Sequence, residues 1–481
     1  MSASRYACLS GLLAAASLLL LGPAAAKETT MKAGTAKAVI TSHESRVMVN
    51  GRVSKGTLHD MHARALVLND GASRLVILTY DLNCLDVATP ILRKRVRDEL
   101  GIAPSHLILL ATHNHSAPIQ IVPDNFDYGR WLASRMFDLI KEAIANERGP
   151  VKLLFGYGPG YFIMSLGNAP TDYEIQVMKV MHGDQTIALL FNHGTHPVHA
   201  SWDKIEVGHP GYAMDEVEAR YPGALALYGD ACGGNQFPEG VKDEETLYNA
   251  GLERAKMIGH KLATAVFHIA EGSMQDVTGP IASKREILAL PLAPPISREE
   301  ALELASKFPK DIGFVPYPQP HRETNWVRML LRYYEKGLPF PKKTADMICT
   351  DDTYLINKAD KEFLEKYDDV IHHEFPCIYN EVIVSKIGPM AFVAMQGEVC
   401  APIGARIKDA FRRDMPIMVF GYMGEHNLYI PTRELVRLKS YQAGTIQTQY
   451  ASPVGWAPEV EDEMVHGVIN FVREVVKQGR R

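Results

Sequence analysis

The sequence LILLATHNHSAP, Leu107–Pro118, decides how the rest of the chain can be arranged. Its five apolar residues, Leu107–Ala111, predict a buried strand. Two histidines, His113 and His115, follow at alternate positions, and a strand presents residues i and i+2 on the same face. Both imidazoles can therefore face one point, where a zinc ion is a common occupant. For this stretch alone, a polar loop with two solvated histidines stays an equal alternative, because His-x-His is short and recurs by chance.

The composition is that of an ordinary globular protein. The chain has 481 residues, of which 46% are hydrophobic and 22% are charged. This length allows one large domain as well as two or three smaller ones. The formal net charge is −5, which argues against general nucleic-acid binding because that function needs a basic face. Six cysteines without a Cys-x-x-Cys pair predict neither a disulfide framework nor a cysteine zinc site, although one or two bridges stay open.

The N-terminus has the three parts of a secretory signal peptide. Arg5 is followed by the apolar run Leu9–Leu21 and then by small residues up to Ala26. The apolar run is shorter than the roughly 20 residues that a bilayer-spanning helix needs, so a retained membrane anchor is the weaker alternative. We therefore predict that residues 1–26 form a signal peptide and that the mature protein is exported, either to the periplasm or as a secreted protein.

The remaining chain alternates apolar strands with amphipathic helices. Helices are predicted over Pro90–Leu100 and Arg130–Glu147, where apolar residues recur at helical spacing. The pattern predicts an α/β (α+β mixed) fold with central mixed β-sheets flanked by helices. Residues 27–481 are expected to form a single domain, without internal repeats. The proline-rich stretch around residues 290–345 is interpreted as an elaboration that covers one side of the core near the substrate entrance.

Three further apolar strands end in candidate ligands, as the first one does. His196 follows one strand within NHGTHPVH, and Glu398 follows another within QGEV. Tyr429 lies in GEHNLYIPT, which follows the third strand. Loops at strand ends are where such proteins place their chemistry. Nitrogen and oxygen ligands from separate loops, with one position left for water, are typical of a catalytic zinc site. Any one of these residues could instead be an ordinary polar residue of the surface or core. Their shared place at strand ends favours a functional site.

At this point the chain resembles the catalytic domain of the neutral/alkaline, non-lysosomal ceramidases. The resemblance runs from about Ala33 to the C-terminus, and the ordered set of motifs is specific although each motif is weak. The matching stretches are HDMHARALVLNDG (His59–Gly71), ATHNHSAP (Ala111–Pro118), GTHPV (Gly194–Val198), HPGYAMDEVEARYPG (His209–Gly223), GDACGGNQFP (Gly229–Pro238), QGE (Gln396–Glu398) and YIPTREL (Tyr429–Leu435).

The resemblance implies a zinc-dependent amidohydrolase that cleaves an N-acyl bond in a small-molecule or lipid substrate, such as ceramide. It implies one Zn²⁺ per chain, in a single hydrolase domain. The implied metal ligands are His113, His196, Glu398 and Tyr429. His115 would lie beside the reacting carbonyl and stabilise or protonate it, and Tyr441 would either lie behind the metal ligands or stabilise the oxyanion. Transient contact with a membrane surface stays open, and the oligomeric state is not predicted.

Three departures from the family pattern put ceramide itself in question. The arginine expected after an asparagine is missing beside Asn168. The Gly-rich loop, Gly229–Pro238, carries Phe237 or Cys232, depending on the register, where a short polar side chain is usual. The C-terminal β-sandwich of the longer ceramidases is expected to be absent. The alternatives are thus a zinc hydrolase of a non-ceramide amide or ester, and a non-catalytic binding homologue. Cys232 could also be the nucleophile of a thiol hydrolase, but the interpretation of Cys232 as a small buried loop residue is favoured.

Overall fold

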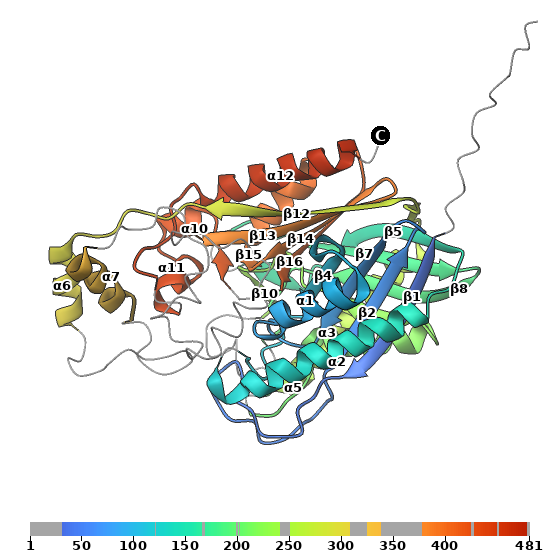
Figure 1. Ribbon diagram of the computed structural model, residues 1–481, viewed down its shortest axis with the longest axis horizontal. Coiled ribbons are helices and arrows are strands. Elements are labelled where there is room, and N and C mark those ends of the chain that lie inside the picture. The colour runs from blue at the N-terminus through green and yellow to red at the C-terminus, as the bar shows by residue number, and fades with distance from the viewer. Residues whose placement is uncertain are drawn as a thin grey trace, which may run out of the picture.

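Two β-sheets packed face to face, with helices on both outer faces, form the body of the protein (Figure 1). This arrangement comes from a computed structural model. The expected signal peptide and the missing-arginine position at Asn168 lie outside the described residues. The structure describes residues 31–120, 122–165, 169–198, 201, 203–240, 251–307, 325–337, 378–424, 428–449 and 452–478.

The larger sheet has eight strands in the order β1-β2-β3-β4-β16-β14-β13-β12. Its pairs are antiparallel except β3 with β4 and β14 with β16, which are parallel. The strands are β1 (Lys32–Val39), β2 (His62–Asn69), β3 (Arg74–Tyr80), β4 (Leu107–Ala111), β12 (Ile281–Leu290), β13 (Ile378–Ile387), β14 (Met390–Gln396) and β16 (Ile417–Met423).

The smaller sheet has five strands in the order β11-β5-β7-β8-β9, and its only parallel pair is β8 with β9. These strands are β5 (Val151–Pro159), β7 (Glu174–His182), β8 (Gln185–Asn192), β9 (Leu225–Tyr228) and β11 (Gln275–Asp276). Apolar side chains from both sheets form one buried layer between them. Within it the rings of Phe392 and Phe420 stack with centroids 4.9 Å apart. The alternation of inward apolar residues along each strand is what places this layer.

Helices cover the outer faces of both sheets. α1 (Ala88–Leu100) and α2 (Phe126–Ala145) pack on the β1–β4 half of the larger sheet, and α9 (Ala401–Asp409) and α12 (Val460–Gln478) pack on its other half. α3 (Gly208–Arg220) and α5 (Gly251–Glu271) cover the smaller sheet. The protein therefore has four layers, helix–sheet–sheet–helix. Among the described residues, no helix is long and apolar enough to cross a bilayer.

Short elements complete the described chain. Within the expected proline-rich elaboration lie α6 (Arg298–Ser306) and α7 (Asn325–Lys336), which pack together at one end of the molecule, with α7 also against α11 (Figure 1). The other short strands and helices are β6 (Ile163–Ser165), β10 (Gln236–Pro238), β15 (Glu398–Val399), β17 (Tyr429–Ile430), α10 (Arg433–Arg437), α11 (Tyr441–Thr448), and the 3₁₀ turns at Pro104–His106 and Pro123–Asn125.

The expected α/β (α+β mixed) fold class, with mixed sheets between helices, is confirmed. The strand predicted at Leu107–Ala111 has those bounds in the structure and is buried at every position. α3 begins at Gly208 and contains Pro210 in its first turn. Proline is tolerated there because its missing N–H would have no partner within the helix.

Candidate metal centre

The candidate site lies where the two halves of the larger sheet meet. β4 and β16 are antiparallel and share a single paired position, Leu110 with Met423. This pair lies at the carboxyl end of both strands, so the two carboxyl ends meet. The Gly-rich loop enters between them: the Asp230 N–H donates to the Ala111 carbonyl, and the Asp230 carbonyl accepts from Gly421 N–H. The loops that leave β4, β8, β14 and β16 therefore face one region of the protein.

These loops bring together the four side chains that were expected to be metal ligands. His113 comes from the loop after β4 and His196 from the loop after β8. Glu398 and Tyr429 lie opposite each other in the parallel pair of β15 and β17, which follow β14 and β16. His196 Nε2 is 2.9 Å from Glu398 Oε2 and 2.9 Å from Tyr429 Oη. His113 Nε2 is 3.4 Å from the same Glu398 oxygen. All four residues are at most 6% exposed.

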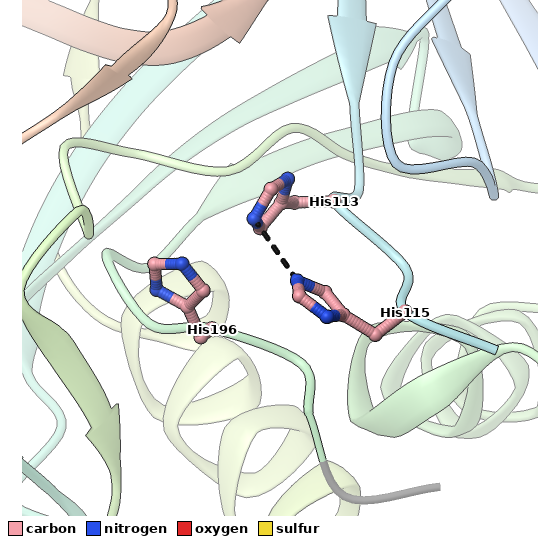
Figure 2. Close-up of side chains that lie close together, drawn as sticks. All are labelled: His113, His115 and His196. Atoms are coloured by element: carbon pink, nitrogen blue, oxygen red, sulfur yellow. Dashed lines mark hydrogen bonds between the residues drawn. The ribbon is translucent and has the colours of Figure 1, made fainter. Parts of the chain in front are cut away.

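His115, which was expected to be a catalytic neighbour, lies beside this group. Its Nε2 is 3.3 Å from His113 Nε2, and Figure 2 shows these two nitrogens pointing toward each other, with His196 beside them. The ring nitrogens of His113, His115 and His196 lie within 4.8 Å of one another, so these three residues could hold a metal ion. Two ligand sets thus share His113 and His196: one adds Glu398 and Tyr429, and the other adds His115.

The hydrogen bonds of His196 show that the site fits a cation. Its Nδ1 lies 3.0 Å from the Gly233 carbonyl oxygen and 3.3 Å from that of Gln236. A carbonyl only accepts, so Nδ1 carries a proton and Nε2 faces the carboxylate oxygen of Glu398. A positive charge between Nε2 and this oxygen, supplied by a bound cation or by a second ring proton, makes the approach favourable. Buried imidazole nitrogen and carboxylate oxygen are ligands that zinc accepts, so the residues fit this metal.

The electrostatics of the cluster keep Glu398 ionised beside its histidines. Burial lowers the pKa of His113 and lowers that of His115 well below its usual value. Burial by itself would raise the pKa of Glu398, but His113 and His196 outweigh it and lower the pKa to about 2. Burial, followed by the charge of Glu398, raises the pKa of Tyr429 well above its usual value. Neutral imidazoles and an ionised carboxylate are the protonation states that bind metals.

Two asparagines that the sequence analysis did not single out shape the histidine loop. His113 has a left-handed backbone with φ of 57°, which costs about 1 kcal/mol or more for a residue with a side chain. Asn114 holds this loop: its Nδ2 donates to the carbonyls of Asp81 (3.2 Å) and Glu206 (2.5 Å). Asn83 Nδ2 lies 3.1 Å from His113 Nδ1. The polar run after β3 was the available signal for Asn83, but nothing in the spacing pointed to its partner.

Tyr441 lies next to the cluster rather than inside it. Its ring is 5.8 Å from the Tyr429 ring in an edge-on arrangement. Tyr441 is the first residue of α11 and is 59% exposed. Its hydroxyl accepts a hydrogen bond of 2.6 Å from Gln449. Tyr441 is thus an outer neighbour of Tyr429, accessible from solvent. Its expected role at the oxyanion stays a prediction.

The Gly-rich loop packs tightly between the His196 loop and the Glu398 strand. A Cβ at Gly194 would lie 2.6 Å from the Cys232 carbonyl oxygen, so this close approach requires glycine. Phe237 stacks on the His196 ring with centroids 4.8 Å apart. Cys232 is buried against Gly404 of α9, and burial raises the pKa of its thiol. A buried neutral thiol is a poor nucleophile, so the geometry does not favour the thiol-hydrolase alternative.

The remaining cysteines bear on the disulfides that the sequence left open. Cys84, Cys232 and Cys400 are buried free thiols. Cys349 and Cys377 lie outside the described residues. No bridge therefore connects the three described cysteines, and the candidate site is held by hydrogen bonds and packing.

Comparison with known proteins places this architecture. No protein-family model matches the sequence, and no curated protein matches it. Among solved structures, the chain is similar to a neutral ceramidase from Pseudomonas aeruginosa, with a TM-score of 0.67 and 17% identity over 94% of this chain and 75% of that one. It is also similar to a ceramidase complexed with C2, with a TM-score of 0.65 and 16% identity over 94% and 76% of the two chains. On this evidence, the chain has the fold of the neutral ceramidases.

Proposed function

We propose that this protein is a zinc-dependent hydrolase of an N-acyl amide bond, with one zinc ion per chain. The observation that carries the proposal is the convergence of His113, His196, Glu398 and Tyr429 at the meeting point of the two half-sheets, with distances of 2.9 to 3.4 Å between their ligand atoms. The similarity to neutral ceramidases supports the choice of an N-acyl bond. A lipid amide is the first substrate class to test.

The positions of these residues suggest a role for each of them in hydrolysis. A bound zinc ion supplies a water with a pKa near 7 and polarises the carbonyl of the scissile amide. His113, His196, Glu398 and Tyr429 would hold the ion and exclude bulk water on the buried side. His115, neutral and beside them, is placed to take a proton from the attacking water and to give it to the nitrogen of the leaving amine. Tyr441, reached from solvent, would contact the substrate at the outer edge.

The direct test is metal analysis of the purified protein together with a hydrolysis assay. We expect about one zinc per chain, and release of fatty acid from ceramides or shorter N-acyl amides. His113→Ala should lose both the zinc and the hydrolysis. A His113→Ala protein that keeps both would overturn the proposal. A zinc-loaded protein inert on every acyl substrate would instead indicate the non-catalytic binding homologue.

A second candidate is a zinc hydrolase of a non-ceramide amide or ester. The observation that favours it is Phe237, an apolar ring on His196 at the place where one register puts a short polar side chain in the family. An apolar surface there replaces a hydrogen-bonding partner that a polar substrate group would use. A substrate panel that contrasts ceramides with N-acyl amines and short esters separates the two candidates by their kcat/KM values.

We also propose that the protein works outside the cytoplasm, after removal of residues 1–26. The support is the basic, apolar and small-residue pattern of that segment. N-terminal sequencing of the mature protein should begin at Lys27. Recovery of full-length protein from the membrane fraction would favour the retained anchor instead.

A further inference from the structure

A series of buried and half-buried polar contacts links α9 to the loop that carries His196. It begins at Lys408, whose side chain is 6% exposed and whose Nζ lies 2.6 Å from Asp172 Oδ2 and 3.2 Å from Glu174 Oε1. Burial by itself would lower the pKa of Lys408, but Asp172 and Glu174 outweigh it and raise the pKa. A buried ammonium is costly unless it is paired. The position of Asp172 is therefore fixed relative to α9.

The next step is Gln236, a fully buried residue of the Gly-rich loop. Its side-chain Oε1 accepts from the Asp172 N–H at 2.6 Å, and its Nε2 donates to the Asp172 carbonyl at 3.3 Å. Nε2 also donates to the Gly194 carbonyl at 2.5 Å. Both ends of the amide are thus bonded to backbone atoms of two other loops. A buried amide with complete hydrogen bonding holds its partners in one arrangement.

The last step reaches His196 itself. The Gln236 carbonyl accepts from the His196 backbone N–H at 3.1 Å and lies 3.3 Å from His196 Nδ1. The Gln236 side chain meanwhile holds Gly194, which directly precedes Thr195 and His196 in the chain. Gln236 therefore contacts the His196 loop at the backbone before the ring and at the ring. A hydrogen bond at the far nitrogen of a metal-binding histidine fixes its tautomer and its orientation.

At Lys408, these contacts connect to the strand that carries the second candidate ligand, Glu398. α9, which carries Lys408, begins at Ala401, directly behind the strand that holds Glu398. The contacts Lys408–Asp172–Gln236–His196 thus connect the elements of two candidate ligands by a route that avoids the ligand atoms. Such a connection can set the His196–Glu398 spacing before any metal binds.

We propose that Lys408, Asp172 and Gln236 are positioning residues that hold His196 at metal-binding distance from Glu398. This inference rests on the proposed function, because it takes His196 and Glu398 as zinc ligands. Residues that support metal ligands in this way change metal affinity by about 10- to 100-fold when they are altered. Lys408→Met, which keeps the length of the side chain and removes its charge, should therefore weaken zinc binding by about that factor. Gln236→Glu, which replaces two donors with acceptors facing carbonyls, should do the same.

The experiment uses the full chain and measures zinc affinity by competition with a chelator. The matched control is Arg412→Met, because Arg412 pairs with Glu174 on the same segment at 2.8 Å but does not contact Asp172. The control should bind zinc within about twofold of the wild type. The absorption spectrum of bound Co²⁺ reports ligand geometry, and it should change in Lys408→Met but not in Arg412→Met. Lys408→Arg, which restores the charge, should recover part of the affinity.

The outcomes separate this inference from the proposed function. Wild-type protein that binds no zinc would overturn both. Wild-type protein that binds zinc, with Lys408→Met and Gln236→Glu binding it equally tightly and giving the same Co²⁺ spectrum, would overturn the positioning role alone. An equal loss in Arg412→Met would show a general effect of charge removal and would also overturn it. If Lys408→Met does not fold, Asp172→Asn tests the same ion pair, because it keeps the backbone groups that bond Gln236.

Discussion

Two short histidine motifs occupy the same edge of the larger sheet, and they have different surroundings. His62 begins β2 at the edge where β3 and β4 end, and His59 precedes it. His113 and His115 follow β4 at that edge. His59 pairs with the carboxylate of Asp215 on α3, with 2.7 Å between Nε2 and Oδ2. Among the described residues, His113 and His115 are instead the ones that meet a third histidine within metal-binding distance.

The difference comes from the neighbouring strands rather than from the motifs. β2 lies between β1 and β3, and the loop before it faces α3 and solvent. β4 lies at the junction of the two half-sheets, where β16 and the Gly-rich loop bring in residues from distant parts of the chain. A pair of histidines at a strand end becomes a candidate metal site only where other strand ends converge on it.

The largest effect is expected from His196→Ala, which removes the histidine that the convergence supplies. Loss of the metal removes several kcal/mol of transition-state stabilisation, so kcat/KM should fall by about a thousandfold or more. Metal analysis should show zinc lost in parallel. His59→Ala is the comparison variant and should keep its zinc and its activity. Zinc loss in His59→Ala would contradict the distinction between the two motifs.

His115→Ala comes next and decides between the two ligand sets around His113 and His196. If His115 is a general acid or base, the variant keeps its zinc and kcat falls by about 10²- to 10⁴-fold. This is the result we expect, because Glu398 and Tyr429 approach His196 more closely, at 2.9 Å each, than the 3.3 Å between His115 and His113. Loss of zinc in His115→Ala would instead assign His115 as a ligand. Metal content and single-turnover rates measured on one preparation distinguish the two results.

The elements around these motifs were predictable to different extents. The strand Leu107–Ala111 is a continuous apolar run, and such a run has few alternatives in a buried sheet. β10, Gln236–Pro238, lies inside a Gly-rich stretch and pairs with β6 over three residues, which leaves no periodic pattern to detect. α11, Tyr441–Thr448, has little difference between its faces, so its sequence did not indicate a helix. Short elements depend on their neighbours more than on their own residues.

The candidate site followed the same rule. That His113, His196, Glu398 and Tyr429 each follow an apolar strand could be predicted from the sequence. Their convergence could not be derived from spacing, because it depends on a junction between half-sheets with one shared pair. Their shared place at strand ends favoured a site, and the resemblance to a known family indicated which four residues meet in it. The supporting groups Asn114 and Gln236 were not anticipated, because a buried amide that bonds to backbone carbonyls has no sequence pattern of its own.

A smaller effect is expected from Tyr441→Phe, which tests how far the site around His113 extends outward. Tyr441 is an exposed residue whose hydroxyl is bonded to Gln449, so loss of the hydroxyl should lower kcat by about tenfold or less. Gln449→Ala, which removes this hydrogen bond and keeps the hydroxyl, is the control and should have a smaller effect. A fall of a hundredfold or more in Tyr441→Phe, the size of a lost oxyanion donor, would place this phenol at the reacting carbonyl.

The smallest effect concerns the first motif and its pH dependence. The hydrogen bond to Asp215 raises the pKa of His59, and this outweighs the effect of its burial. A histidine whose pKa is raised by folding stabilises the protein fully below its unfolded pKa of about 6.5, and the contribution is lost as the pH rises through the folded value. His59→Gln should therefore lower the free energy of unfolding at pH 6 and change it less at pH 9.

The size of this difference is limited because Asp215 is 39% exposed, so solvent screens the pair and at most about 1 kcal/mol is expected. Urea unfolding of both proteins at the two pH values measures it. The hydrolysis rate of the folded variant should keep the pH profile of the wild type, because His59 lies outside the cluster of His113, His115 and His196. A shifted profile would mean that the two motifs are coupled through the sheet edge they share, and that the boundary drawn between them is wrong.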